Sequence, residues 1–164
     1  MKKQNIADLA TFLEEDLGRG DVTSESLVPK TREAHGTVCA AEAGILAGLE
    51  EAALLAASVS LEITTYAIDG DDFLPGHIVI ELTGAARAVL GIERTMLNVM
   101  SHMSGVATTT HRAITAVTKA HKGLHADNPP RITATRKTLP GLRTLQKKAV
   151  VLGGGLPHRL DLAE

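Results

Sequence analysis

Aromatic side chains are scarce in this sequence of 164 residues, which contains two phenylalanines, one tyrosine and no tryptophan. Proteins that bind single-stranded nucleic acid usually stack the bases on aromatic side chains. We therefore expect no nucleic-acid partner. The hydrophobic core must be built from aliphatic residues and methionine, and a hydrophobic share of 44% is sufficient for a folded globular protein of this length.

Cysteine occurs once, as Cys39, so no disulfide can form within the chain. We expect a small buried thiol at this position rather than a nucleophile. Long apolar runs are also lacking, because the longest, around residues 52–61, is too short and too interrupted by serine to span a bilayer. Polar residues directly follow Met1-Lys2-Lys3, which argues against a signal peptide. We therefore expect a cytoplasmic protein with no membrane partner.

Acidic residues are absent between Asp127 and Asp161, although basic residues are frequent there. Residues 1–93 contain 6 basic and 16 acidic residues, a net charge of −10, whereas residues 94–164 contain 11 and 3, a net charge of +8. Together they give the −2 of the whole chain. Clustering of like charge costs free energy through self-repulsion, so this distribution predicts an anionic ligand. The basic residues of the stretch are Arg131, Arg136, Lys137, Arg143, Lys147, Lys148 and Arg159.

The first part of the sequence, to about Gly84, predicts an α+β unit. Apolar residues recur at helical spacing between Ile6 and Leu17, which is typical of an amphipathic helix. Turn residues cluster at 69–72 and 75–76. We expect strands at 36–41, 61–66 and 77–82, a second strand or a turn at 44–48, and a helix at 49–57.

From Ala85 onward the spacing of apolar residues is helical. The apolar stripe of residues 89–103 predicts a long helix that ends near Ser104-Gly105, and residues 108–120 predict a second helix. We expect a short strand at 132–135, then a helix at 142–152 that three glycines close. Strand, loop and helix form one unit of a parallel α/β fold. One unit cannot close a sheet or barrel, so we expect the remainder to be missing or supplied by another chain.

Two basic segments are candidates for anion binding. Thr135-Arg136-Lys137 lies where the expected strand ends, the edge at which α/β folds bind ligands. Arginine offers a planar fork for a carboxylate or phosphate, and lysine adds a mobile point charge. His158-Arg159 follows the glycines and could orient an anion or move a proton. For both segments the alternative is an ordinary solvated loop.

Arg94 lies on the expected long helix between the apolar positions Ile92 and Met96. We therefore expect its side chain to border the packed face of the helix rather than open water. A guanidinium held there requires a partner, which could be Glu93, a neighbouring subunit or a bound anion. The histidines show no paired spacing typical of zinc ligands, so we assign no metal site.

Taken in order, these segments resemble the quinolinate phosphoribosyltransferase family, the carboxylating nicotinate-nucleotide pyrophosphorylases of NAD biosynthesis. The resemblance covers nearly the whole chain from about Glu14, and matches the N-terminal portion of the family. Six ordered segments at consistent spacing are more specific than any one alone. They are residues 15–24, 42–48, 69–76, 93–108, 135–143 and 153–159.

The resemblance implies an α+β N-terminal sandwich domain with a linking helix over residues 1–104. Residues 105–164 would be the first unit of a β/α barrel, with the barrel incomplete in this chain. The implied enzyme is a homodimeric pentosyltransferase that acts on quinolinate and phosphoribosyl pyrophosphate. It joins the quinolinate ring nitrogen to C1 of the ribose, releases pyrophosphate and CO2, and yields nicotinate mononucleotide.

The resemblance also implies the residues of the site. Arg136 and Arg159 would bind the two carboxylates of quinolinate, and Arg94 would enter the pocket from the partner subunit. Lys137 would be the catalytic residue and reach toward substrate oxygens. The implied substrate-binding set is Arg94, Thr135, Arg136, Lys137, His158 and Arg159.

This sequence departs from the family pattern in three respects. Ala134 stands where many members have an acid, and Gln146-Lys147-Lys148 stands where Glu-Lys-Tyr is common, which is expected to alter local pairing. The acids that bind Mg2+ with phosphoribosyl pyrophosphate, and the phosphate loops, would lie beyond this chain. We therefore expect the 164-residue chain not to turn over by itself.

Two alternatives stay open. The first is an enzyme of the same fold with another substrate, either a molybdenum-associated pyrophosphorylase-like protein or a nicotinate phosphoribosyltransferase. The second is a naturally short, non-catalytic dimerising or anion-binding protein. In that case the apolar stripe of residues 89–103 would form an interface, and the basic stretch would bind anions passively.

Overall fold

The computed structural model describes residues 6–121 and 130–159 of the chain. Within these ranges, no helix combines the length and the apolar character that crossing a bilayer requires. The helices are α1 (Ile6–Leu17), α2 (Val22–Leu27), α3 (Leu49–Ser58), α4 (Ala86–His121) and α5 (Arg143–Leu152). The strands are β1 (Glu33–Cys39), β2 (Gly44–Ile45), β3 (Glu62–Thr65), β4 (Asp72–Phe73) and β5 (Ile78–Ala85).

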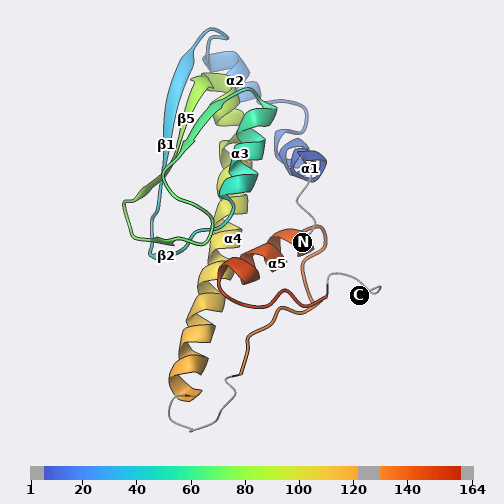
Figure 1. Cartoon of the computed structure of the whole chain (residues 1–164). Helices are drawn as coiled ribbons and strands as arrows, with labels where there is room; N and C mark the ends of the chain where they lie inside the picture. The colour runs from blue at the N-terminus through green and yellow to red at the C-terminus, as the bar shows by residue number, and fades with distance from the viewer. Residues whose placement is uncertain (1–5, 122–129, 160–164) are drawn as a thin grey trace.

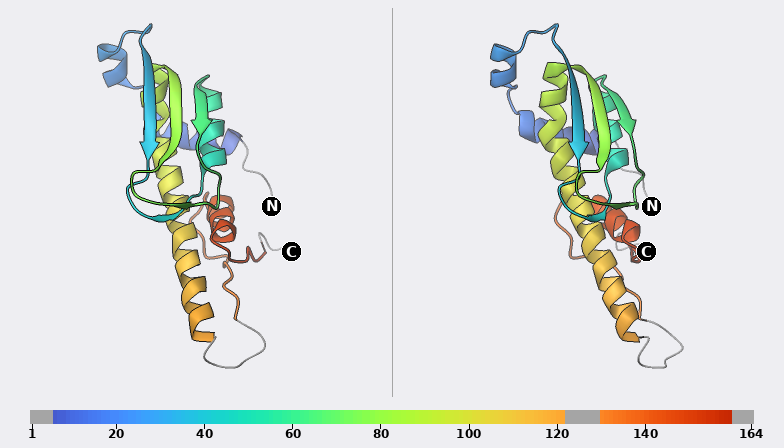
Figure 2. Two further views of the ribbon diagram at one scale, coloured as in Figure 1. Left: turned by 60° about the vertical axis from the view of Figure 1, so that its left-hand side comes forward. Right: turned by 90° about the vertical axis from the view of Figure 1, so that its left-hand side faces the viewer.

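A three-stranded antiparallel sheet in the order β1-β5-β3 forms one layer, and α3 and α4 cover one of its faces (Figures 1 and 2). The central strand β5 pairs Leu82 with Gly36 of β1 and with Ile63 of β3. The other face of the sheet is open. These strands confirm the elements predicted for the first part of the sequence, although β2 contains only two residues.

The prediction of a buried thiol is wrong, because Cys39 is exposed. Along β1, exposed and half-buried residues alternate, beginning with exposed Glu33. Successive side chains of a strand point to opposite faces of the sheet. Cys39 therefore lies on the open face, where its apolar character contributes nothing to the core.

The two helices predicted on either side of Ser104-Gly105 are one helix, α4, of 36 residues. Figure 1 shows it running without a break from the sheet past α5. The serine hydroxyl accepts a hydrogen bond from Ala47 N at 3.0 Å, and Thr108 Oγ1 accepts one from Ile45 N at 2.9 Å. Ser104, which suggested a helix end, therefore binds the segment between β2 and α3, and this packing outweighs the low helix propensity of glycine.

Gly105→Ala is expected to raise the free energy of unfolding by about 0.5–1 kcal/mol. Alanine is the better helix former by about that amount, and no atom lies within 4 Å of the position its Cβ would occupy. Urea unfolding followed by circular dichroism measures the change. Gly48→Ala is the control, because Gly48 has φ +106° and its Cβ would lie 3.1 Å from Met100 Cα. A loss of stability in Gly105→Ala would contradict an unbroken helix at this point.

Helix α4 contributes to both hydrophobic clusters of the chain. Ile92, Met96 and Met100 pack in the cluster that lies between the sheet, α1 and α3. Val99 and Met103 belong to the second cluster, beside α5. The apolar stripe of residues 89–103 thus serves the core of the chain itself. It is not the interface that the dimerising alternative required.

The strand predicted at 132–135 is reduced to one parallel bridge between Thr133 and Leu156. Ala134 N donates to Leu156 O at 2.8 Å, and Leu156 N donates to Ile132 O at 2.9 Å. Helix α5 connects the two bridged segments and packs against α4 (Figure 1). The described residues form a small sheet with helices and no closed barrel.

Candidate functional site

The bridge between Thr133 and Leu156 brings the two basic segments together. Its two strands run parallel, so the residues that follow each bridging residue emerge at the same end. Thr135 comes two residues after Thr133, and His158 comes two residues after Leu156. Thr135-Arg136-Lys137 and His158-Arg159 therefore leave one edge of the bridge side by side.

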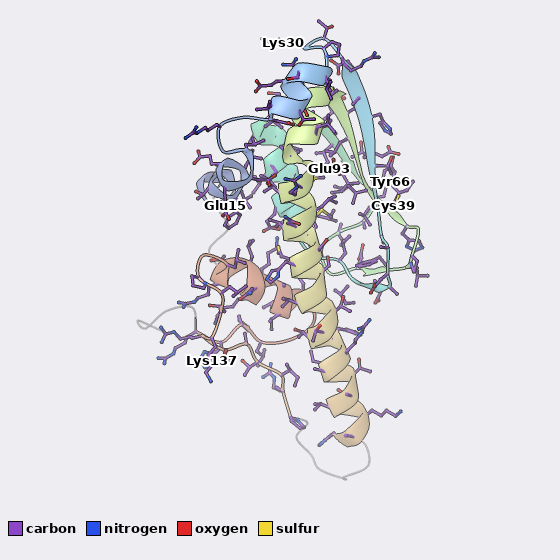
Figure 3. All side chains as sticks on the ribbon, turned by 180° about the vertical axis from the view of Figure 1, so that it is seen from behind. Glu15, Lys30, Cys39, Tyr66, Glu93 and Lys137 are labelled. Carbon is purple, nitrogen blue, oxygen red and sulfur yellow. The ribbon has the colours of Figure 1, made fainter. Side chains whose placement is uncertain are left out.

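Residues 135–141, which we call the basic loop, are held by short-range contacts. Thr135 Oγ1 accepts a hydrogen bond from Lys137 N at 3.0 Å. The Lys137 side chain is exposed. Figure 3 shows it on the segment beyond α5, away from the sheet. The backbone is thus tied down while the ammonium group remains free to reach a ligand in solvent.

Arg136 carries an unsatisfied polar atom. Its side chain is half-buried, and its Nε atom is buried without a hydrogen-bond partner in the described part of the chain. An unpaired buried donor costs about 1–3 kcal/mol, and more when the group is charged. A bound anion would remove this cost, because a carboxylate accepts two parallel hydrogen bonds from a guanidinium.

His158 and Arg159 are both exposed, and His158 has a left-handed backbone with φ +54°. The backbone of the segment that carries them is held by hydrogen bonds from Lys147 of α5, whose side chain is fully buried. Lys147 Nζ donates to Pro157 O at 2.7 Å and also to Arg159 O. Sequence reasoning did not identify this role, because Lys147 lies off the apolar stripe of α5 and has no acidic neighbour in the sequence.

Lys148 serves the fold rather than a ligand. Its Nζ lies 2.8 Å from Glu50, 2.9 Å from Glu51 and 3.0 Å from Asp69. Burial alone would lower the pKa of this ammonium, but the hydrogen bonds that it donates to Glu50 and Glu51 outweigh burial and raise the pKa above its ordinary value. One charge of the basic stretch is therefore neutralised by the acidic half of the chain.

The expected placement of Arg94 is wrong. Its side chain is 75% exposed and pairs with Asp16 of α1, with 3.2 Å between Nη1 and Oδ1. Arg94 lies about 200° around the helix from both Ile92 and Met96, and at this position of α4 that direction leads away from the core. Figure 3 shows the preceding residue, Glu93, on the upper half of α4, whereas Lys137 lies lower, on the loop segment beyond α5. Within a single chain, Arg94 therefore does not lie beside the two basic segments.

Two side chains of α5 contact the basic loop. Arg143 Nε donates to Thr138 Oγ1 at 3.1 Å, and Gln146 Oε1 accepts from Leu139 N at 3.2 Å. The amide nitrogen of Gln146 lies 3.1 Å from Nε2 of His102 on α4. These contacts tie the loop to both helices. Sequence reasoning missed them, because their only local sign is a polar residue next to an apolar position.

The arrangement suits a small organic anion better than a metal ion. Among residues 6–121 and 130–159, no group of three or more histidine, cysteine, aspartate or glutamate side chains could hold a metal. The two basic segments instead present two arginines, a lysine, a histidine and a hydroxyl at one edge. Such a set can bind a ligand with two carboxylates.

Two family models of known domains match this sequence. The one described as quinolinate phosphoribosyl transferase, N-terminal domain, matches residues 21–104. The one described as its C-terminal domain matches residues 106–164.

Individual relatives agree with these matches. A protein of Methanothermobacter thermautotrophicus described as a probable nicotinate-nucleotide pyrophosphorylase (carboxylating) is 39% identical over 90% of this chain and 50% of its own length. The nicotinate-nucleotide pyrophosphorylase (carboxylating) of Mycobacterium leprae is 40% identical over 93% of this chain and 52% of its own. The crystal structure of NadC from Streptococcus pyogenes superposes with a TM-score of 0.85 at 31% identity, over 96% of this chain and 55% of that one.

Proposed function

Because the chain belongs to the quinolinate phosphoribosyltransferase family, we propose that it forms part of an enzyme that makes nicotinate mononucleotide from quinolinate and phosphoribosyl pyrophosphate. The chain spans about half the length of the curated relatives it matches. In this proposal residues 1–104 are a sandwich domain with its linking helix. Residues 105–164 are the first unit of a β/α barrel.

One observation carries the proposal: Arg136, whose buried Nε has no partner among the described residues, stands beside a second basic segment at the same edge. Quinolinate has two neighbouring carboxylates, and each needs a cationic fork. Arg136 and Arg159 are the proposed forks. Thr135 and His158 supply further polar contacts, and Lys137 is exposed and able to reach the substrate from the basic loop.

The proposed reaction needs positive charge at this edge. The ring nitrogen of quinolinate forms a bond to C1 of the ribose as the bond from C1 to the pyrophosphate oxygen breaks. The bond between C2 of the ring and its carboxylate then breaks, CO2 leaves, and a proton takes its place at C2. Cations fixed before the reaction stabilise the departing pyrophosphate without further reorganisation. Lys137 is the proposed catalytic residue in this respect.

We also propose that the functional unit is a homodimer, in which Arg94 completes the pocket of the partner subunit. Its exposed side chain, and the position of the neighbouring Glu93 on a different part of the molecule from Lys137 in Figure 3, support a role outside its own chain. Mg2+ would accompany phosphoribosyl pyrophosphate. The described residues provide no set of ligands that fits it, so no step is assigned to a metal on this part of the chain.

Calorimetric titration with quinolinate and with nicotinate tests the substrate. We expect quinolinate to bind about 10-fold or more tightly, because a hydrogen-bonded charge contributes roughly 1.5–3 kcal/mol and nicotinate lacks one carboxylate. Arg136→Ala should weaken quinolinate binding by a similar factor. Arg131→Ala is the matched control, because Arg131 is exposed and lies before the bridge.

The outcomes separate the alternatives. Equal affinity for the two ligands would favour a nicotinate phosphoribosyltransferase. If Arg136→Ala and Arg131→Ala lose the same amount of affinity for quinolinate, the anion is attracted by the net charge of the stretch and not by a specific site. Absence of quinolinate binding would contradict the proposed pocket.

A further inference from the structure

Two contacts through one side chain, that of Gln146, connect helix α4 to the basic loop. His102 of α4 lies 3.1 Å from the amide nitrogen of Gln146, and the amide oxygen of the same Gln146 lies 3.2 Å from Leu139 N. Gln146 is half-buried between its two partners. The loop residue Leu139 is thus connected, through one side chain, to a titratable residue on another helix.

The chemistry of these groups fixes the direction of both hydrogen bonds. The backbone N–H of Leu139 can only donate, so the amide oxygen of Gln146 must face it. The amide nitrogen, which has two hydrogens and accepts none, then faces His102. Nε2 of His102 must therefore accept, and in neutral imidazole the proton then resides on Nδ1.

The hydrogen bond between Leu139 N and Gln146 fixes the part of the basic loop next to the proposed site. Arg143, which lies three residues before Gln146 on α5, holds Thr138 through its hydroxyl. Thr138 and Leu139 directly follow Lys137, and the Thr135 hydroxyl fixes Lys137 N from the other side. The backbone that carries Arg136 and Lys137 is held at both ends.

We propose that His102 and Gln146 are positioning residues for the basic loop, and that His102 performs this role only in its neutral form. The contact between His102, Gln146 and Leu139 follows from the two distances alone. Its consequence for ligand binding rests on the proposed function.

Protonation of His102 breaks the chain of contacts whichever way Gln146 turns. If the amide stays in place, its N–H groups face an imidazolium N–H, and two donors cannot bond. If the amide rotates by half a turn, its oxygen accepts from His102, but its nitrogen then faces the N–H of Leu139. One of the two hydrogen bonds is lost in either case.

The charged groups that share a cavity with His102 lie on α1. Together with His102, Glu15 and Asp16 of α1 line a cavity of about 290 Å³ between α1, α4 and α5, and Asp16 is already paired with Arg94. The other polar lining residues there are Thr95 and Asn98, both uncharged. On its other side His102 borders a groove lined by Ser101, Thr109 and apolar residues. Histidine side chains change charge between about pH 5 and 8, so we expect the loop to loosen as the pH falls through this range.

Gln146→Glu is the decisive variant. A carboxylate accepts from Leu139 N and from His102 Nε2–H at once, so it favours the protonated imidazole. The variant should therefore retain the contact at acid pH. His102→Lys provides a group that can only donate, and it should lose the contact at every pH. In His102→Gln the new amide oxygen can accept from the Gln146 amide, so this variant should keep the contact that His102→Lys loses.

Nuclear magnetic resonance of the 164-residue chain labelled with 15N provides the direct test. At pH 7.5 we expect the imidazole of His102 to carry its proton on Nδ1. The hydrogen-exchange protection factor of the Leu139 amide should fall by about threefold to tenfold between pH 7.5 and 5.5, the range for one lost hydrogen bond. In Gln146→Glu the protection should not fall. A proton on Nε2 at pH 7.5, or the same protection of Leu139 at both pH values, would overturn the proposal.

Calorimetry with quinolinate then tests the positioning role. The ratio of wild-type affinity to Gln146→Glu affinity should fall between pH 7.5 and 5.5, and this ratio cancels any titration of the ligand. An unchanged ratio would show that the contact does not position the site. If no quinolinate binds at either pH, the proposed function is wrong, and the magnetic resonance result alone decides whether the contact depends on neutral His102.

Discussion

Lys148→Met is expected to lower the free energy of unfolding by roughly 3–5 kcal/mol, the usual cost of removing one partner from a buried ion pair. The change leaves three carboxylates without their common cation: Glu50, Glu51 and Asp69. The Glu51 side chain is only 2% exposed. Asp69 cannot turn away freely, because its Oδ1 accepts from Gly48 N and Leu49 N at the start of α3.

The pH dependence of this contribution follows from the raised pKa of Lys148. A group whose pKa is higher in the folded state stabilises the fold fully below its unfolded pKa and loses that effect as the pH rises. The ordinary value is 10.5. The difference in stability between wild type and Lys148→Met should thus be constant from neutral pH to about pH 10 and decrease above it.

Guanidinium unfolding across this pH range measures the effect. Lys119→Met is the matched control, because Lys119 is exposed in the last turn of α4, and its loss should change stability by less than about 0.5 kcal/mol. A loss below about 1 kcal/mol in Lys148→Met would mean that the carboxylates of Glu51 and Asp69 are solvated, contrary to their burial in the fold.

Lys147→Met is expected to lower the free energy of unfolding by roughly 2–4 kcal/mol. Methionine fills most of the volume of the buried lysine, so the main loss is that of hydrogen bonds from a charged donor, each worth about 1.5–3 kcal/mol. Their acceptors are the carbonyls of Pro157 and Arg159. These carbonyls lie near the surface and can regain water, which keeps the expected loss below the sum for two such bonds.

This variant should also weaken quinolinate binding in the proposed site, because the backbone of Arg159 loses its anchor. Lys137→Met is the counterpart. Lys137 is exposed, so its loss should reduce binding and leave unfolding unchanged. Equal stability of Lys147→Met and wild type would exclude a structural role for the buried lysine. Chemical unfolding and calorimetry on the same preparations separate the two effects.

Sequence periodicity predicted the N-terminal unit well, because its strands and helices each bury one face. Periodicity failed where contacts between different helices and strands determine where a helix ends or which face of a strand is buried. A serine and a glycine at 104–105 indicated a helix end, yet Ser104 binds the segment between β2 and α3 and the helix continues. Cys39 is apolar but lies on the open face of β1. No local pattern contains this information, since the partner of each residue lies far away in the sequence.

The sequence indicated which basic segments belong to the candidate site, but not which of their charges already have partners in the fold. The ordered motifs indicated both basic segments, and the bridge between Thr133 and Leu156 brings them to one edge. The acid-free stretch, however, suggested a single ligand site for charges that have different roles. Lys148 neutralises acids of α3, and Lys147 binds carbonyls. Net charge along a sequence cannot distinguish a cation that awaits a ligand from one that already has partners in the fold.

The unbroken helix α4 has a consequence for how this protein can be divided. The two family matches meet at residues 104–106, in the middle of a rod about 54 Å long at 1.5 Å per residue. A cut there would leave Val99 and Met103 on one piece and Ala107 on the other, although all three belong to one cluster. The two matched regions therefore share one helix and one hydrophobic cluster, and we expect neither to fold when it is expressed without the other. A rotation of one relative to the other must bend a continuous rod, so no flexible joint separates them.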